Sequence, residues 1–228
     1  MKEIKLYGSP ISNYFNKVKL ALNLKKLNFT IVRFAPSEND AEYLQKNPMG
    51  FIPTIEVDGK FIAESQPILE FLEVYFPEAP RLVPEDPFEA ARIRQIINYI
   101  EVYLDQNGRR IARYFFEGKK PDKGVIKEVE PVLKRTRRAL EIACRFNPYI
   151  AGTNVSMADC SAYPSFHAFD RLLARVFGPQ HPLFEMPQFE NYLSFLNNQE
   201  IFKEIEDTRL KTKKLLERTN LIAKKRPV

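Results

Sequence analysis

Cysteine and histidine, the side chains most often used for nucleophilic and metal chemistry, are scarce in this chain. The cysteines are Cys144 and Cys160, and the histidines are His167 and His181. The cysteines have neither CxxC spacing nor neighbouring histidines, so they predict no disulfide scaffold and no cysteine-rich metal site. The histidines do not stand with carboxylates in a ligand spacing. We therefore expect no metal ion and no Ser-His-Asp hydrolysis, and we expect both cysteines to be small core residues.

Hydroxyl side chains are better placed for chemistry, because two groups of them stand where helices are predicted to begin. The first group lies in residues 7–14, with the sequence Tyr-Gly-Ser-Pro-Ile-Ser-Asn-Tyr. The second is Glu64-Ser65, just before an apolar helical pattern. The N-terminus of a helix carries free N–H groups and favours negative charge. Taken alone, however, Glu64-Ser65 is equally well explained as a helix cap.

The elements around these groups predict an α/β unit. Residues 4–7 alternate like a short strand, residues 14–24 repeat apolar side chains at helical spacing, and residues 29–34 are rich in β-branched and aromatic side chains. This order implies a parallel crossover between the two strands. The predicted helix is amphipathic, and its opposite, polar face contains Asn16, Lys17, Lys19, Asn23, Lys25 and Lys26.

A hairpin and another helix follow. Asp58-Gly59 joins two runs within residues 53–63, which is a strong hairpin signal. A short helix is predicted around residues 42–46, and a longer one ends at Phe76-Pro77. The first 77 residues thus predict the order βαβαββα, as in a thioredoxin-like domain.

The rest of the chain predicts helices only. Four prolines between Pro77 and Pro87 favour an extended linker. We expect residues 1–77 to form the α/β domain, residues 78–87 the linker and residues 88–228 an all-helical domain. Helical spacing of apolar side chains is found in residues 88–117, 125–145, 157–176, 189–196 and 201–216.

Composition excludes several other classes of protein. The chain has 228 residues, 44% of them hydrophobic and 28% charged, which is typical of a globular protein. The longest stretch without an acidic or basic residue, 146–158, is too short to cross a bilayer. No signal peptide is visible, so we expect a cytoplasmic location. The positive charge is concentrated on residues 81–228, whose 26 basic and 19 acidic side chains give +7, but no nucleic-acid motif accompanies it, so we expect no nucleic acid as a partner.

The start of the helix at residue 157 carries a capping signal. Ser156 can cap the backbone N–H of Asp159, whose carboxylate can reach back to the N–H of Ser156. Capping explains this aspartate completely, so we expect it to be structural and not catalytic.

These residues together resemble the cytosolic glutathione S-transferase superfamily over the whole chain. The stretch 47–55, Asn-Pro-Met-Gly-Phe-Ile-Pro-Thr-Ile, is similar to the family's NPxGxVPxL motif with its cis-proline. Glu64-Ser65 after the hairpin and the Ser-x-x-Asp capping box also match the family. The resemblance implies a transferase that activates the thiol of glutathione for attack on a small electrophile. It also implies glutathione as co-substrate and a twofold homodimer.

The resemblance implies a glutathione site made from three residues and a cis-proline. A cis peptide before Pro53 would turn the N–H and C=O of Ile52 outward to pair with the cysteinyl backbone of glutathione. Ser65 would bind the γ-glutamyl carboxylate at a helix N-terminus, and Glu64 would accept a hydrogen bond from the ammonium group of glutathione.

The resemblance also places the catalytic hydroxyl in residues 7–14. Aligning residues 18–22, Val-Lys-Leu-Ala-Leu, with the serine-type classes (zeta, theta and delta) puts Ser12 on their catalytic serine. A hydroxyl donor aimed at the sulfur lowers the pKa of the thiol, which is roughly 8.5 when free. Asn13 or Tyr14 could supply the donor instead, and Tyr7 matches the tyrosine-type classes.

Some features depart from the family pattern. No cysteine lies near the loop, which argues against the disulfide-forming relatives. Phe51 stands where many relatives carry a lysine that pairs with the glycine carboxylate of glutathione. The loop of residues 7–14 also lacks the serine-serine-cysteine pattern of the zeta class. The sequence identifies no particular electrophile, and we expect the electrophile pocket to lie between the domains. Candidate lining residues are Tyr103, Arg110, Arg113, Tyr114 and Phe166.

An interaction protein with the same fold is the alternative. The stretch from Ser12 to Leu22 and the helix at Asp159-Cys160 also look like stringent starvation protein A, which contacts RNA polymerase without glutathione chemistry. A shared fold does not fix a function. The intact Glu64-Ser65 pair favours the transferase.

Overall fold

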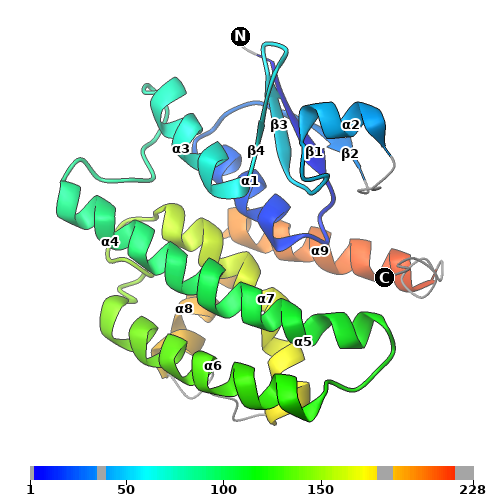
Figure 1. Cartoon of the computed structure of the whole chain (residues 1–228). Coiled ribbons are helices and arrows are strands. Elements are labelled where there is room, and N and C mark those ends of the chain that lie inside the picture. The colour runs from blue at the N-terminus through cyan, green and yellow to red at the C-terminus, as the bar shows by residue number, and fades with distance from the viewer. Residues whose placement is uncertain (1–2, 35–39, 179–186, 219–228) are drawn as a thin grey trace.

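The computed structural model describes residues 3–34, 40–178 and 187–218, and it confirms the predicted α/β unit followed by helices (Figure 1). The sheet has the strand order β2-β1-β3-β4, in which β1 and β2 are parallel and the other pairs are antiparallel. The α/β elements are β1 (Ile4–Gly8), α1 (Asn13–Leu24), β2 (Thr30–Arg33), α2 (Ala41–Lys46), β3 (Thr54–Val57), β4 (Lys60–Ala63) and α3 (Ser65–Tyr75).

The two faces of the sheet differ in what covers them. Side chains alternate along β1, and its fully buried Leu6 contributes to the main hydrophobic core with residues of α1 and α3. Tyr7 points to the opposite face, where its ring lies 6.5 Å from the ring of Tyr43 on α2. The hairpin between β3 and β4 forms as predicted, with positive φ angles of 50° at Asp58 and 77° at Gly59.

The remaining described elements are all helical, as predicted. The seven residues Tyr99–Asp105, labelled η1, wind as a π-helix inside the long helix expected at residues 88–117. A π-turn shifts the positions that follow it, and Leu104 and Asp105 are both fully buried. The other helices are α4 (Pro87–Asn98), α5 (Gln106–Phe116), α6 (Lys123–Ala143), α7 (Met157–Phe177), α8 (Pro187–Asn197) and α9 (Glu200–Arg218).

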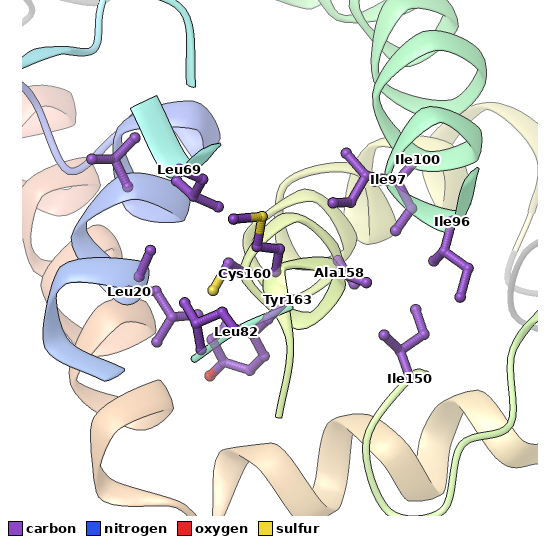
Figure 2. Packing of buried hydrophobic residues seen from close by; sticks show 14 of the residues in the cluster. Leu20, Leu69, Leu82, Ile96, Ile97, Ile100, Ile150, Ala158, Cys160 and Tyr163 are labelled. Atoms are coloured by element: carbon purple, nitrogen blue, oxygen red, sulfur yellow. The ribbon is translucent and has the colours of Figure 1, made fainter. Parts of the chain in front are cut away.

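Helix α7 holds the two halves together. It packs against α1, α4, α5, α9 and η1. In Figure 2, Leu20 of α1, Leu69 of α3, and Cys160 and Tyr163 of α7 belong to one cluster of buried residues. Buried apolar residues from both halves form one continuous cluster. Cys160 is therefore a core residue as expected, and Cys144 is half-buried; burial raises the pKa of both thiols.

The start of α7 carries the predicted capping box. The carboxylate of Asp159 accepts the backbone N–H of Ser156 at 2.8 Å and its hydroxyl at 2.9 Å. It also accepts the N–H of Ile150 and the hydroxyl of Tyr192, two contacts that the sequence did not indicate. A fully buried carboxylate with four donors is a structural group, as expected.

The polar face of α1 differs from a solvated helix face. Lys17, Lys19 and Lys25 are all buried, and each pairs with a carboxylate of another helix. The ammonium of Lys25 also donates to the carbonyl of Pro80, which fixes the segment between α3 and α4. Leu82 in that segment is buried, so the segment packs on the core.

Gly108 of α5 allows close packing against α7. A Cβ atom at this position would lie 2.5 Å from the ring of Phe169. Alanine is a better helix former than glycine, so at an open site the change would stabilise the helix by about 1 kcal/mol. Here we expect Gly108→Ala to lower the free energy of unfolding by about 1–3 kcal/mol because of the overlap.

Denaturant unfolding measures this prediction, with Phe169→Leu as the partner of a double-mutant cycle. The smaller side chain should recover part of the loss in the double variant. A stabilised Gly108→Ala protein would contradict the packing described.

Candidate active site

The register of the sheet brings three loops to one end. Tyr7 of β1 pairs with Thr54 of β3, which pairs in turn with Ala63 of β4. The segment after β1, the segment before β3 and the segment after β4 therefore emerge side by side. Ser12, Ile52-Pro53 and Glu64-Ser65 lie on these segments, and α1 and α3 both begin at this end.

Gly8, the last residue of β1, allows the segment after β1 to pack closely against the segment before β3. A Cβ atom on Gly8, whose φ is +147°, would lie 2.6 Å from the ring of Phe15 and 3.3 Å from the Cβ of Ile52. The missing side chain lets the end of β1 lie directly against the Ile52-Pro53 segment.

Ser12 is the N-cap of α1 and is half-buried. Its Oγ accepts the backbone N–H of Phe15 at 3.3 Å. Acceptance of this bond leaves the hydroxyl hydrogen free to donate. The first N–H groups of a helix also have no partners within the helix, so this position suits an anion.

The Ile52-Pro53 peptide is cis, as the motif implied. The preceding carbonyl, of Phe51, accepts the hydroxyl of Tyr43 and the amide of Asn47, each at 2.7 Å. The backbone N–H and C=O of Ile52 form no hydrogen bond with another described residue. These two groups are therefore available to an extended ligand.

Glu64 has an unusual backbone conformation, with φ 67° and ψ 122°. Residues outside the common regions cost about 1–3 kcal/mol and cluster at ligand sites. The side chain of Glu64 is exposed and makes no capping bond, whereas Ser65 is buried as the first residue of α3. The turn thus presents an exposed carboxylate beside the N-terminus of a helix.

The phenol of Tyr7, which could also supply the donor to sulfur, lies on the other face of the sheet. Its hydroxyl donates to Glu56 at 2.6 Å. Burial, followed by the bond to Glu56, raises the pKa of Tyr7 to about 12. Its hydrogen is thus committed to a partner away from the start of α1.

The side chains of Asn13 and Tyr14, which follow Ser12 in the loop, both contact residues of the helical half. The buried amide of Asn13 donates to Asp105 at 2.7 Å and to Ser165 at 3.1 Å. The guanidinium of Arg109 lies 4.6 Å from the ring centroid of Tyr14, and burial raises the pKa of that phenol. The amide hydrogens of Asn13 are therefore both engaged, whereas the ring contact with Arg109 does not engage the phenol hydrogen of Tyr14.

Sequence reasoning missed Asp105, which lies beneath the first turn of α1. Its Oδ2 accepts the amide of Asn13 and, at 3.0 Å, the hydroxyl of Ser165, while its buried Oδ1 has no hydrogen-bond partner. Burial raises the pKa of Asp105 to about 7, against the opposing charge of Arg109. The only available signal was an aspartate near an apolar helical stripe.

One of the expected electrophile-lining residues is placed differently from the prediction. Phe166 is buried against the rings of Phe189 and Tyr192. It therefore belongs to the core and does not line a pocket. Arg110 pairs with Glu128 on α6.

The other expected lining residues lie at or near the surface. Arg113 lies over the ring of its neighbour Tyr114, and Tyr103 is exposed. Of the histidines, His167 is mostly buried, with Nδ1 3.7 Å from Glu206, and His181 lies outside the described residues.

Comparison with known proteins gives the family. Residues 6–80 match the family described as Glutathione S-transferase, N-terminal domain. A glutathione S-transferase from Pseudomonas putida is 34% identical over 164 residues, which cover 68% of this chain and 70% of that protein. The chain belongs to the glutathione S-transferase superfamily.

Other members of the superfamily extend this likeness. A probable maleylacetoacetate isomerase from Drosophila melanogaster is 26% identical over 65% of this chain and 66% of its own. The fold of this transferase matches a glutathione transferase from Populus trichocarpa with a TM-score of 0.73 at 22% identity, over 90% of this chain and 99% of the other. Within the described part of this transferase, no helix is both long enough and apolar enough to cross a membrane.

The buried Asp105 predicts a specific dependence of stability on pH. Its pKa is about 7 in the folded protein and near the ordinary 3.8 when unfolded. The folded state therefore holds the proton more tightly, and unfolding between about pH 4 and 7 releases it. We expect this carboxyl to reduce stability by about 1.4 kcal/mol for each pH unit of increase within that window.

The measurement compares the free energy of unfolding of the wild type and Asp105→Asn from pH 5 to pH 8. The wild type should lose stability relative to the variant up to about pH 7 and then run parallel to it. Asp207→Asn, which removes an exposed carboxylate on α9, is the matched control. Parallel curves across the whole range would show that Asp105 is ionised throughout.

Proposed function

We propose that this transferase binds reduced glutathione at the shared end of β1, β3 and β4, and activates its thiol through Ser12 for attack on a small electrophile. The observation that carries the proposal is the strand register, which gathers Ser12, Ile52 and Glu64-Ser65 from three separate segments. Each segment offers groups that suit a different part of the tripeptide.

The role of Ser12 follows from proton chemistry. A free thiol has a pKa of roughly 8.5, so little thiolate exists at neutral pH. A hydroxyl that donates to sulfur stabilises the thiolate and lowers this pKa. The Oγ of Ser12 already accepts from Phe15, so its hydrogen is the part left to offer. The N-terminus of α1 adds a favourable potential for the anion.

The remaining contacts are proposed for the glutathione backbone and its γ-glutamyl end. The free N–H and C=O of Ile52, held by cis-Pro53, would pair with the cysteinyl residue in antiparallel fashion. The hydroxyl and N–H groups at Ser65 would bind the γ-glutamyl carboxylate, and Glu64 its ammonium. The exposed ring of Phe51 offers no charge to the glycine carboxylate, so affinity should be lower than with a lysine there.

We further propose the division into residues 1–77 as the glutathione-binding domain, 78–87 as the linker and 88–228 as the helical domain. A twofold homodimer and a cytoplasmic location, as the superfamily implies, belong to this proposal. The proposed reaction calls for no metal ion. The named relatives are transferases and isomerases, which favours the enzyme over an interaction protein like stringent starvation protein A.

Ser12→Ala should remove most of the bound thiolate at neutral pH, because the donor to sulfur is lost. The ultraviolet absorbance of the glutathione thiolate, measured at saturating glutathione, reports this directly. Since Ser12 also caps α1, a stability loss of about 1 kcal/mol is expected. The measurement is therefore made well below the unfolding temperature.

Ser9→Ala, a serine of the same loop, is the matched control. Thiolate that persists undiminished in Ser12→Ala would transfer the role to a donor of Asn13 or Tyr14.

Ser65→Ala should weaken glutathione binding, because a hydrogen bond to a charged carboxylate is lost. Such bonds contribute about 1.5–3 kcal/mol, so the dissociation constant should rise roughly 10-fold to 150-fold. Calorimetric titration with reduced glutathione measures it, and Ser194→Ala on the surface of α8 is the control. Wild-type protein that shows no saturable binding at millimolar glutathione would overturn the proposed function itself.

A further inference from the structure

Arg109 of α5 lies beside the start of α1 and has no acidic partner among the described residues. Its Nη2 donates to Oδ1 of Asn13 at 2.6 Å, and its guanidinium lies over the ring of Tyr14. Within the described part of the chain, no carboxylate lies within 4.0 Å of it as an ion pair. The side chain is exposed, and most of its five N–H donors remain open.

The orientation of Arg109 is imposed by a buried network. Asn13 uses one amide hydrogen on Asp105 and the other on Ser165, and the hydroxyl of Ser165 donates to the same carboxylate. With both hydrogens engaged, the Oδ1 of Asn13 can only face outward as an acceptor. The guanidinium is therefore anchored at one edge while its other edge stays open.

Two other arginines of the helical half are paired with carboxylates. Arg94 makes two hydrogen bonds to Glu70, and Arg110 pairs with Glu128. Asp105, one turn before Arg109, directs its bonded oxygen to Asn13 and Ser165 instead. Arg109 thus keeps its positive charge unpaired, among the described residues, at the point where α5 meets the first turn of α1.

This position lies next to the proposed thiol site. Asn13 follows Ser12 directly, and consecutive Cα atoms are only about 3.8 Å apart. An electrophile attacked near Ser12 would therefore come within reach of the guanidinium. A fixed, planar fork of donors matches a carboxylate in two-point geometry and loses little side-chain freedom on binding.

We propose that Arg109 binds a carboxylate of the electrophile, so that this transferase prefers anionic, carboxylate-bearing electrophiles over neutral ones. The inference rests on the proposed function, because it assumes glutathione activated at Ser12. Arg109 would orient the substrate, and Asp105, Asn13 and Ser165 would hold Arg109.

A carboxylate electrophile and its neutral methyl ester test the inference. The probes are 4-chloro-3,5-dinitrobenzoate and its methyl ester. In both, the thiolate sulfur forms a bond to the ring carbon, chloride leaves with the bonding electrons, and the thiol proton goes to solvent. Each enzymatic kcat/KM is divided by the rate constant of the uncatalysed reaction with glutathione, which removes the difference in intrinsic reactivity.

The wild type should favour the acid over the ester by about tenfold or more after this correction. Arg109→Gln should lower the acid-to-ester ratio by about 10-fold to 100-fold, and Arg109→Lys by less, because lysine keeps the charge but not the fork. Arg92→Gln on α4, whose arginine pairs with Glu89, is the control and should leave the ratio unchanged.

Each outcome decides between the proposals. A wild type that uses acid and ester equally, or an Arg109→Gln variant with an unchanged ratio, overturns the anionic preference and leaves the transferase intact. A wild type that accelerates neither reaction and does not bind glutathione in the calorimeter overturns both. If Arg109→Gln does not fold, the wild-type ratio and Arg109→Lys still decide, because a lysine variant with the full wild-type ratio excludes two-point binding.

Discussion

Helix α1 is buried on nearly all sides, and the need to pair its polar groups organises the rest of the molecule. Buried polar groups cost free energy unless they are hydrogen-bonded, and buried charges cost more. Lys17 is almost inaccessible, yet it reaches Gln66 of α3 and Glu101 of η1, and Ser161 of α7 donates to the same carboxylate. One side chain of α1 thus joins three other helices.

This pairing fixes the position of the α/β unit relative to the helical half. Ion pairs in a low-dielectric interior rarely add much stability over apolar packing, but breaking one partner leaves an uncompensated charge. Burial lowers the pKa of Lys17, and the nearby carboxylate of Glu101 opposes that shift. The charge of Lys17 is therefore stabilised only while Glu101 stays in place. Because Gln66 follows Ser65 directly, the same contact fixes the N-terminus of α3 relative to that of α1. The two helix ends that face the proposed ligand are therefore held by one buried contact.

Local patterns in the sequence predicted the elements that depend on local chemistry. Asp58-Gly59 predicted the hairpin because few other residues adopt its turn, and Ser156 with Asp159 predicted a capping box because both partners lie within one turn. The burial and pairing of the α1 lysines could not be predicted from local patterns. Periodicity separates a polar face from an apolar one, but it does not tell whether water or the carboxylates of another helix lie opposite.

Asp105 and Arg109 escaped prediction for a different reason. They lie at the end of the π-helical segment η1 and one turn beyond it, where an extra residue per turn shifts which side chains face inward, so extrapolation at 3.6 residues per turn fails. The shift buries Asp105 under α1 and leaves Arg109 exposed one turn later. The spacing of four residues places Asp105 and Arg109 on the same helix face, where both contact Asn13. π-helical turns are frequent at functional sites, and the position of η1 directly before Arg109 supports a role for this segment in shaping the site beside Ser12.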